Sequence, residues 1–194
     1  MPKKIGILAL QGAFREHAQK MIALGAVATE IRQKKDLQNL DGIILPGGES
    51  TTIGKLLIDL EIFDPLKQML QSGLPAFGTC AGAILLSDNI VNSNQPRLGG
   101  LDIAIERNAF GRQTESFETD LEIPELGHAP FPCVFIRAPL MDNPGKNVKV
   151  LASLTINDKK RPVAVAQDNL LAISFHPELT DDNRFHEYFL KMVN

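Results

Sequence analysis

Short apolar runs alternate with amphipathic segments along the first part of the chain. Four continuous apolar runs predict strands, at residues 5–10, 27–31, 42–45 and 74–77. Such runs are typical of parallel strands that are buried on both faces. The segments between them, 14–25, 50–60 and 64–73, place apolar residues at helical spacing. Strands that alternate with helices predict a parallel sheet covered by helices on both faces.

The boundaries of these helices carry local signals. Ser50 is a candidate N-cap for the helix that follows it, because its hydroxyl can accept a hydrogen bond from a free backbone N–H. Asp64 with Pro65 predicts the start of the next helix, and Gly73 predicts its end.

The pattern changes between residues 99 and 165, where helical periodicity is weak. Five β-like pieces lie there, at 101–107, 116–121, 134–138, 148–154 and 163–166. We expect them to form an antiparallel or mixed extension of the sheet within one domain that spans residues 1–194. A last strand at 170–175 and a helix with an apolar stripe that includes Phe185, Phe189 and Met192 complete an α/β fold of three layers.

Composition excludes several classes of protein. The 194 residues are 44% hydrophobic, enough for a sizeable core, and the net charge is −3 without a basic stripe. We therefore expect binding neither to nucleic acid nor to membrane surfaces. The first apolar run is too short for a signal peptide, and no run approaches the ~18 residues of a membrane span. Cys80 and Cys133 lie in separate segments without metal-ligand spacing, so we predict no metal and no cofactor. A free thiol would not survive easily in an oxidising compartment, so we predict a cytoplasmic protein.

One motif carries the first chemical signal. The segment from Gly78 to Gly82 reads Gly-Thr-Cys-Ala-Gly and lies between a predicted strand and a predicted helix. This is the sulfur form of a nucleophile elbow, in which flanking glycines avoid collisions at a sharp turn. A helix N-terminus beside Cys80 favours the thiolate. A buried structural cysteine is the alternative, and the full motif favours the nucleophile.

A second motif supplies a proton carrier. His176 and Glu178 directly follow the last predicted strand, at the edge of the sheet where Cys80 is expected. The histidine can exchange a proton with the thiol, and the carboxylate two residues later can orient the imidazole. His-Pro-Glu alone is more typical of a surface turn, and only its combination with the cysteine motif favours the catalytic interpretation. We interpret the other three histidines, His17, His128 and His186, as exposed.

Ligands of doubly wound sheets bind beyond the carboxyl ends of the strands. That rule places Gln11, the loop from Gly47 to Ser50, and Cys80 in one cleft. A thioester mechanism needs donors for an oxyanion. The backbone N–H of Ala81 is one candidate and the turn at Gly48 offers a second, although Pro-Gly-Gly is also an ordinary turn.

These motifs together resemble the class I, or triad-type, glutamine amidotransferases. Further segments make the chain similar to the glutaminase subunits of pyridoxal phosphate (vitamin B6) synthase. They read Leu-Gln-Gly-Ala from Leu10, Pro-Gly-Gly-Glu-Ser-Thr-Thr from Pro46, Glu-Arg-Asn from Glu106, Phe-Gly-Arg-Gln from Phe110, and Phe-Ile-Arg-Ala-Pro from Phe135. The matches cover essentially the whole chain, and the fold they imply is the flavodoxin-like amidotransferase fold.

The resemblance implies hydrolysis of L-glutamine by Cys80, His176 and Glu178. Carried over to this sequence, it implies substrate contacts at Gly48, Glu49, Ser50, Arg107, Ile136 and Arg137. Gln11 is implied in the oxyanion region and in partner docking and activation. A salt bridge within the sheet extension is an equally open role for Arg137, and the sequence leaves open which arginine binds the substrate carboxylate.

The resemblance also implies a partner. Ammonia would pass to a barrel-shaped pyridoxal 5'-phosphate synthase subunit, in an assembly of twelve copies of each chain. Three alternatives remain at this point: the glutaminase of another synthase, a cysteine hydrolase or stress protein on a similar fold, and a non-catalytic binding module. The Glu49 loop, the Arg107 segment and the intact triad count against them.

Overall fold

The computed structural model describes residues 1–107 and 116–193. The segment Phe-Gly-Arg-Gln at 110–113 and Asn108, which contribute to the family resemblance, lie outside the described residues. Within the described ranges, no helix is both long enough and apolar enough to cross a membrane.

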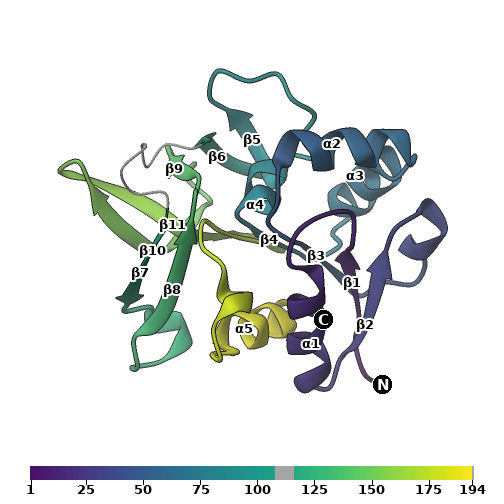
Figure 1. Ribbon diagram of the computed structural model, residues 1–194, viewed down its shortest axis with the longest axis horizontal. Coiled ribbons are helices and arrows are strands. Elements are labelled where there is room, and N and C mark those ends of the chain that lie inside the picture. Colours follow the sequence, from purple (N-terminus) through teal and green to yellow (C-terminus); the bar gives the residue numbers. More distant parts are fainter. Residues whose placement is uncertain (108–115, 194) are drawn as a thin grey trace.

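A seven-stranded sheet forms the centre of the molecule (Figure 1). Its strands are β1 (Lys4–Leu8), β2 (Val27–Ile31), β3 (Gly42–Leu45), β4 (Ala76–Thr79), β10 (Lys149–Ile156), β11 (Lys159–Gln167) and β12 (Leu170–Ile173). Their order is β10-β11-β12-β4-β3-β1-β2. The five strands from β12 to β2 are parallel, as the apolar runs predict, and β11 and β10 pair antiparallel at one edge.

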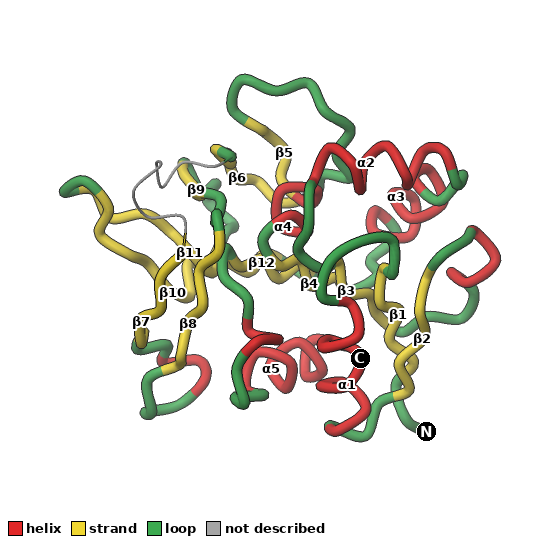
Figure 2. Tube along the Cα trace, viewed as in Figure 1, coloured by secondary structure: helices red, strands yellow, loops and turns green. Residues whose placement is uncertain are grey.

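In the described part of the chain, five helices complete a three-layer α/β arrangement. They are α1 (Phe14–Ala23), α2 (Ser50–Asp59), α3 (Phe63–Gln71), α4 (Ala81–Leu86) and α5 (Arg184–Met192). One core cluster joins α2, α3 and α4 to one face of the sheet, and a second joins α1 and α5 to the other. Figure 2 shows these two helical layers on opposite sides of the strands. The predicted fold class is confirmed.

Side-chain alternation explains how the sheet serves both cores. On β3, Ile43 and Leu45 belong to the cluster under α2 and α3, whereas Ile44 belongs to the cluster over α1 and α5. Successive residues of a strand point to opposite faces, so a strand covered on both sides must be apolar throughout. All four residues of β3 are buried.

The middle of the chain is more divided than the sequence predicts. Among the strands of the described residues, only β10 and β11 extend the main sheet. A three-stranded sheet forms from β5 (Ser87–Ile90), β6 (Leu101–Glu106) and β9 (Leu140–Asp142), and a two-stranded sheet from β7 (Ser116–Leu121) and β8 (Phe131–Ile136). The periodicity of a strand specifies which faces are buried but not which strand it pairs with. Short 3-10 turns lie at Lys34–Leu37, Pro124–Leu126 and Pro177–Leu179.

Two predicted helix starts are shifted, α2 by one residue and α3 by two. Ser50 is the first residue of α2, and its N-cap is Glu49, whose side chain accepts a hydrogen bond from the N–H of Thr52. Helix α3 begins at Phe63, so Asp64 lies within its first turn. Because a carboxylate can cap a helix N-terminus as a hydroxyl does, Glu49 takes the capping role that was predicted for Ser50.

Candidate active site

Four loops meet at the carboxyl edge of the parallel strands. They follow β1, β3, β4 and β12 and carry Gln11, the Gly48–Ser50 loop, Cys80 and His176. A cavity of about 490 Å³ opens between them and the β8 end. It is lined by Gln11, Ala13, Gly48, Glu49, Ser50, Cys80, Ile84, Arg107, Ile136, Arg137, Pro139, His176 and Leu179. The sequence-predicted site residues therefore lie together, with Ala81 and Glu178 just behind the cavity wall.

Cys80 occupies a strained turn between β4 and α4. Its φ of 50° and ψ of −104° are unusual for a residue with a side chain. Such backbone costs on the order of 1–3 kcal/mol and concentrates at functional sites. A Cβ on Gly78 would lie 2.6 Å from the carbonyl carbon of Gly82, and one on Gly82 would lie 1.8 Å from the carbonyl oxygen of Leu45. The flanking glycines thus allow the strand–helix contact that holds the thiol at the cavity.

His176 lies between the thiol and a buried carboxylate. Its Nδ1 is 2.7 Å from Oε1 of Glu178, and Glu178 is 4% exposed. Gly47 leaves the space for the imidazole, because a Cβ there would lie 2.6 Å from its Cε1. Burial alone would lower the pKa of His176. Hydrogen bonds to Cys80 and Glu178, together with their charges, outweigh burial and raise the pKa to about 10.

The raised pKa can be measured directly. We expect the Cε1–H resonance of His176 to titrate in NMR near pH 10, well above the ordinary value of about 6.5. The Cys80→Ala variant should titrate at lower pH, because it lacks one of the two groups that stabilise the imidazolium. A wild-type midpoint near the ordinary value would contradict this assignment.

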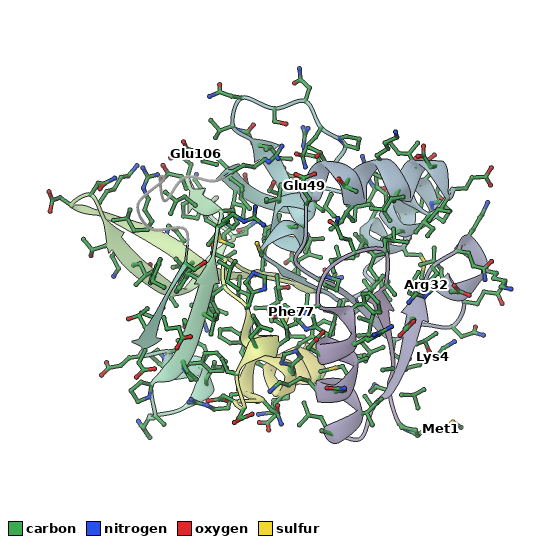
Figure 3. The ribbon with its side chains drawn as sticks, viewed as in Figure 1. Met1, Lys4, Arg32, Glu49, Phe77 and Glu106 are labelled. Atoms are coloured by element: carbon green, nitrogen blue, oxygen red, sulfur yellow. The ribbon has the colours of Figure 1, made fainter. Side chains whose placement is uncertain are left out.

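Glu49 organises the loop after β3. Its N–H donates to Oε1 of Gln11 at 2.6 Å, which fixes the loop against the segment after β1. Its carboxylate accepts hydrogen bonds from Thr51 and Thr52. Partial burial alone would raise the pKa of Glu49, but these hydrogen bonds outweigh it and lower the pKa. The carboxylate is therefore an anion at the mouth of the cavity, where Figure 3 shows Glu49 at the start of α2.

Two arginines line the cavity, and they differ in whether the guanidinium has a partner among the described residues. Arg107 pairs with Oε1 of Glu49 at 2.8 Å and donates to Oε1 of Gln95 at 2.9 Å. Arg137 follows β8 with a left-handed φ of 42° and is exposed. Within residues 1–107 and 116–193 its guanidinium makes no hydrogen bond or ion pair, so the structural salt bridge considered for Arg137 is not formed there.

Gln95 is a site residue that the sequence motifs did not indicate. Its Oε1 accepts hydrogen bonds from Arg107 and from the hydroxyl of Ser50 at 3.2 Å. It lies in the loop between β5 and β6, which neither motif nor periodicity marks. Only the folded arrangement brings this loop beside α2.

The expectation that His17 and His186 are exposed is wrong. Both are completely buried behind the triad, between the sheet and helices α1 and α5, whereas His128 is exposed as expected. A signal was present for His17, because it lies three residues after Phe14 and four before Met21, on the apolar face of α1. Among the described residues no group of three or more His, Cys, Asp or Glu side chains could hold a metal ion.

The comparison with known families agrees with this geometry. A model described as the SNO glutamine amidotransferase family matches residues 7–194. The chain belongs to this family. Two curated relatives named pyridoxal 5'-phosphate synthase subunit PdxT come from Carboxydothermus hydrogenoformans and Moorella thermoacetica. They are 56% and 53% identical, over 98% of this chain and 97% and 99% of their own.

Solved structures share the architecture of this SNO family member. A crystal structure of a glutamine amidotransferase superposes with a TM-score of 0.89 at 52% identity, covering 97% of this chain and 98% of the other. The structure of PurLQS from Thermotoga maritima has a TM-score of 0.70 at 15% identity, covering all of both chains. The second likeness shows the fold alone.

Proposed function

We propose that this SNO family member is the glutaminase subunit of a pyridoxal 5'-phosphate synthase, and that one domain over residues 1–194 hydrolyses L-glutamine to L-glutamate and ammonia. The observation that carries the proposal is the convergence of Cys80, His176 and Glu178 on one cavity. Relatives 50–56% identical that carry the name PdxT support the choice of synthase.

The chemistry follows from the triad. The Cys80 thiolate attacks the side-chain amide carbon of glutamine, and the His176 imidazolium gives its proton to the departing ammonia. A water molecule then gives a proton to the neutral imidazole and attacks the thioester, which releases glutamate and regenerates the thiolate–imidazolium pair. Glu178 holds Nδ1 of His176 at 2.7 Å throughout and stabilises the charged ring.

The charges at the cavity mouth suit the amino-acid end of glutamine. A guanidinium without another partner can bind the α-carboxylate with two parallel hydrogen bonds. Arg137 lines the cavity and has no ion pair with any residue of 1–107 or 116–193. The Glu49 carboxylate, held by Arg107, suits the α-ammonium group. Gly48, Ser50 and Ile136 line the space between these charges and Cys80.

The proposed oxyanion hole uses the backbone N–H groups of Ala81 and Gly48. Ala81 is the first residue of α4, where N–H groups have no acceptor within the helix. Gly48 has a φ of 144°, which glycine alone adopts readily, so a flip of the peptide at Gly47–Gly48 is open to this turn. Gln11 accepts a hydrogen bond from the N–H of Glu49, the next residue of the loop. If the synthase subunit docks beside Gln11, a movement of Gln11 can change the conformation of the Gly47–Gly48 turn.

The proposed partner is the barrel-shaped synthase subunit, in an assembly of twelve copies of each chain. Ammonia passes to that subunit without release into solvent. A nucleophilic free thiol is best preserved in a reducing compartment, so we place the enzyme in the cytoplasm. Neither metal nor cofactor takes part in the proposed reaction.

Glutamine hydrolysis with and without the synthase subunit tests this function. We expect weak release of glutamate from the chain alone and an increase on the order of tenfold or more when the synthase is added, within the ordinary range of coupling between two sites. The Gln11→Ala variant should lose most of the increase, because the Glu49 N–H loses its acceptor.

Three results would contradict the proposal. An absence of hydrolysis even with the synthase present would exclude the glutaminase. Hydrolysis that the pyridoxal 5'-phosphate synthase subunit does not change would favour the glutaminase of another synthase. An ester-hydrolysing activity without glutamine hydrolysis would favour a cysteine hydrolase on the same fold.

A further inference from the structure

A buried line of polar side chains continues behind the triad. Nε2 of His17 on α1 lies 3.4 Å from Oε2 of Glu178 and 3.2 Å from the hydroxyl of Thr79. Nδ1 of His17 lies 2.9 Å from Nε2 of His186 on α5. His17, Thr79 and His186 are fully buried. The triad glutamate is thus contacted by His17 from α1 as well as by His176, and Thr79 and His186 contact His17 in turn.

The contacts of these buried side chains determine which ring nitrogens of His17 and His186 carry a proton. Oε1 of Glu178 already accepts a hydrogen bond from His176, whereas no described group makes a hydrogen bond to Oε2. Nε2 of His17, which is hydrogen-bonded to the hydroxyl of Thr79, faces Oε2 at 3.4 Å. A buried carboxylate oxygen facing a nitrogen lone pair would be costly, so Nε2 of His17 carries a proton. Nδ1 of His17 is then an acceptor for the Nε2–H of His186. The bare Nδ1 of His186 then has no hydrogen-bond partner among the described residues.

The same surroundings keep both rings neutral. Burial lowers the pKa of His17 well below its ordinary value, and the neighbouring His186, His176 and Lys20 act in the same direction. Burial, with a contribution from Lys20, lowers the pKa of His186 to about 3. A neutral His17 still donates one hydrogen bond. The positive charge of the site can therefore remain on His176, where the reaction uses it.

Aromatic packing fixes the two rings. Phe77, which Figure 3 shows in the centre of the molecule, lies edge to face with His17 at 6.1 Å and with His186 at 5.6 Å between ring centroids. Helix α1 also holds the triad turn at a second point, because Nζ of Lys20 donates to the carbonyl of Thr180. The rings cannot turn without displacing this core.

We propose that His17 is a positioning residue of the triad: its Nε2–H faces Oε2 of Glu178 at 3.4 Å and attracts it, so that Oε1 stays directed at His176. His186 sets the tautomer of His17 that makes this possible. The inference rests on the proposed glutaminase function. Oε2 lies where water does not reach it, so removal of His17 leaves a buried carboxylate held at one oxygen only. Its rotation would misalign the imidazole and slow both chemical steps, while the substrate contacts around Arg137 and Glu49 remain.

Two substitutions separate positioning from packing. His17→Leu removes the donor at similar volume, and His17→Gln can place an amide N–H near the position of Nε2. With saturating synthase we expect kcat of His17→Leu to fall roughly 10- to 100-fold, as when outer hydrogen-bond partners of metal-binding side chains are removed. KM for glutamine should stay within about twofold, because ground-state contacts are kept. His17→Gln should recover most of kcat, and His128→Leu, at an exposed histidine, should match the wild type.

A spectroscopic measurement gives an answer that does not depend on turnover. The Nδ1–H proton of His176, bonded to Glu178, should give a resonance far downfield in the wild type and in His17→Gln. It should broaden or disappear in His17→Leu. The positioning role would be overturned if His17→Leu left both the resonance and kcat unchanged. It would also be overturned if His17→Leu and His17→Gln lowered kcat equally. Lack of glutamine hydrolysis by the wild type would instead refute the proposed function, and the resonance would still decide the role of His17.

Discussion

Replacement of Cys80 by alanine should reduce glutamine hydrolysis by at least about 10⁴-fold, because a triad without its nucleophile retains only the catalysis of the remaining binding groups. A diazoketone analogue of glutamine should alkylate the wild type, and mass spectrometry of peptides should place the adduct on Cys80. The variant should show no adduct. The rate of glutamine hydrolysis and the site of alkylation test the identity of the nucleophile independently.

Cys133 provides the matched control. It is buried on β8, and burial, with the charges of Asp120 and Asp182, raises its pKa to about 12. At neutral pH it is a thiol in the core, and thiols are poor nucleophiles. Cys133→Ala should keep both the activity and the label at Cys80. An adduct on Cys133, or substantial hydrolysis by Cys80→Ala, would refute the assignment of the nucleophile.

The Gly82→Ala substitution should destabilise the fold by roughly 3 kcal/mol or more, at the upper end of what an inserted methyl group costs. The new Cβ would lie 1.8 Å from the carbonyl oxygen and 2.9 Å from the Cβ of Leu45. Both contacts are with strand β3, which cannot yield as the end of a flexible side chain can. Relief requires α4 to move away from β3, and Cys80 moves with it. The free energy of unfolding in urea measures the effect.

Gly54→Ala is the corresponding control within a helix. Its Cβ would lie 3.4 Å from the carbonyl oxygen of Pro96, an ordinary contact, and Gly54 lies inside α2. Alanine is favoured over glycine in a helix by roughly 0.5–1 kcal/mol, so this variant should be as stable as the wild type or slightly more stable. If Gly82→Ala unfolds at the same urea concentration as Gly54→Ala, the steric role of Gly82 is wrong.

Much of the fold could be predicted because the relevant signals are local. The continuous apolar runs at β1, β3 and β12 require burial on both faces, and a parallel sheet between two helical layers is the ordinary solution. The rule that loops at the carboxyl ends form the site then brings Gln11 and Cys80 together without knowledge of the angles between elements. These predictions used only periodicity and strand direction.

The failures concern contacts between distant segments. His17 and His186 are 169 positions apart, and nothing in the sequence around either indicates that their rings meet. Taken alone, each histidine is a polar residue that is expected in solvent. A buried histidine is tolerated only where another group satisfies its nitrogens, and that partner becomes visible only in the folded chain.

The sequence by itself determined the chemical groups of this protein: a cysteine between two glycines after a strand, a histidine and a glutamate two residues apart, and a glycine-rich loop. These are local features, because strand, turn and helix propensities act over a few residues. The tertiary structure alone decided which oxygen of Glu178 each histidine contacts, which arginine is paired, and that Gln95 joins the site. Such contacts depend on packing across the sheet, which relates residues by distance in space and not by separation along the chain.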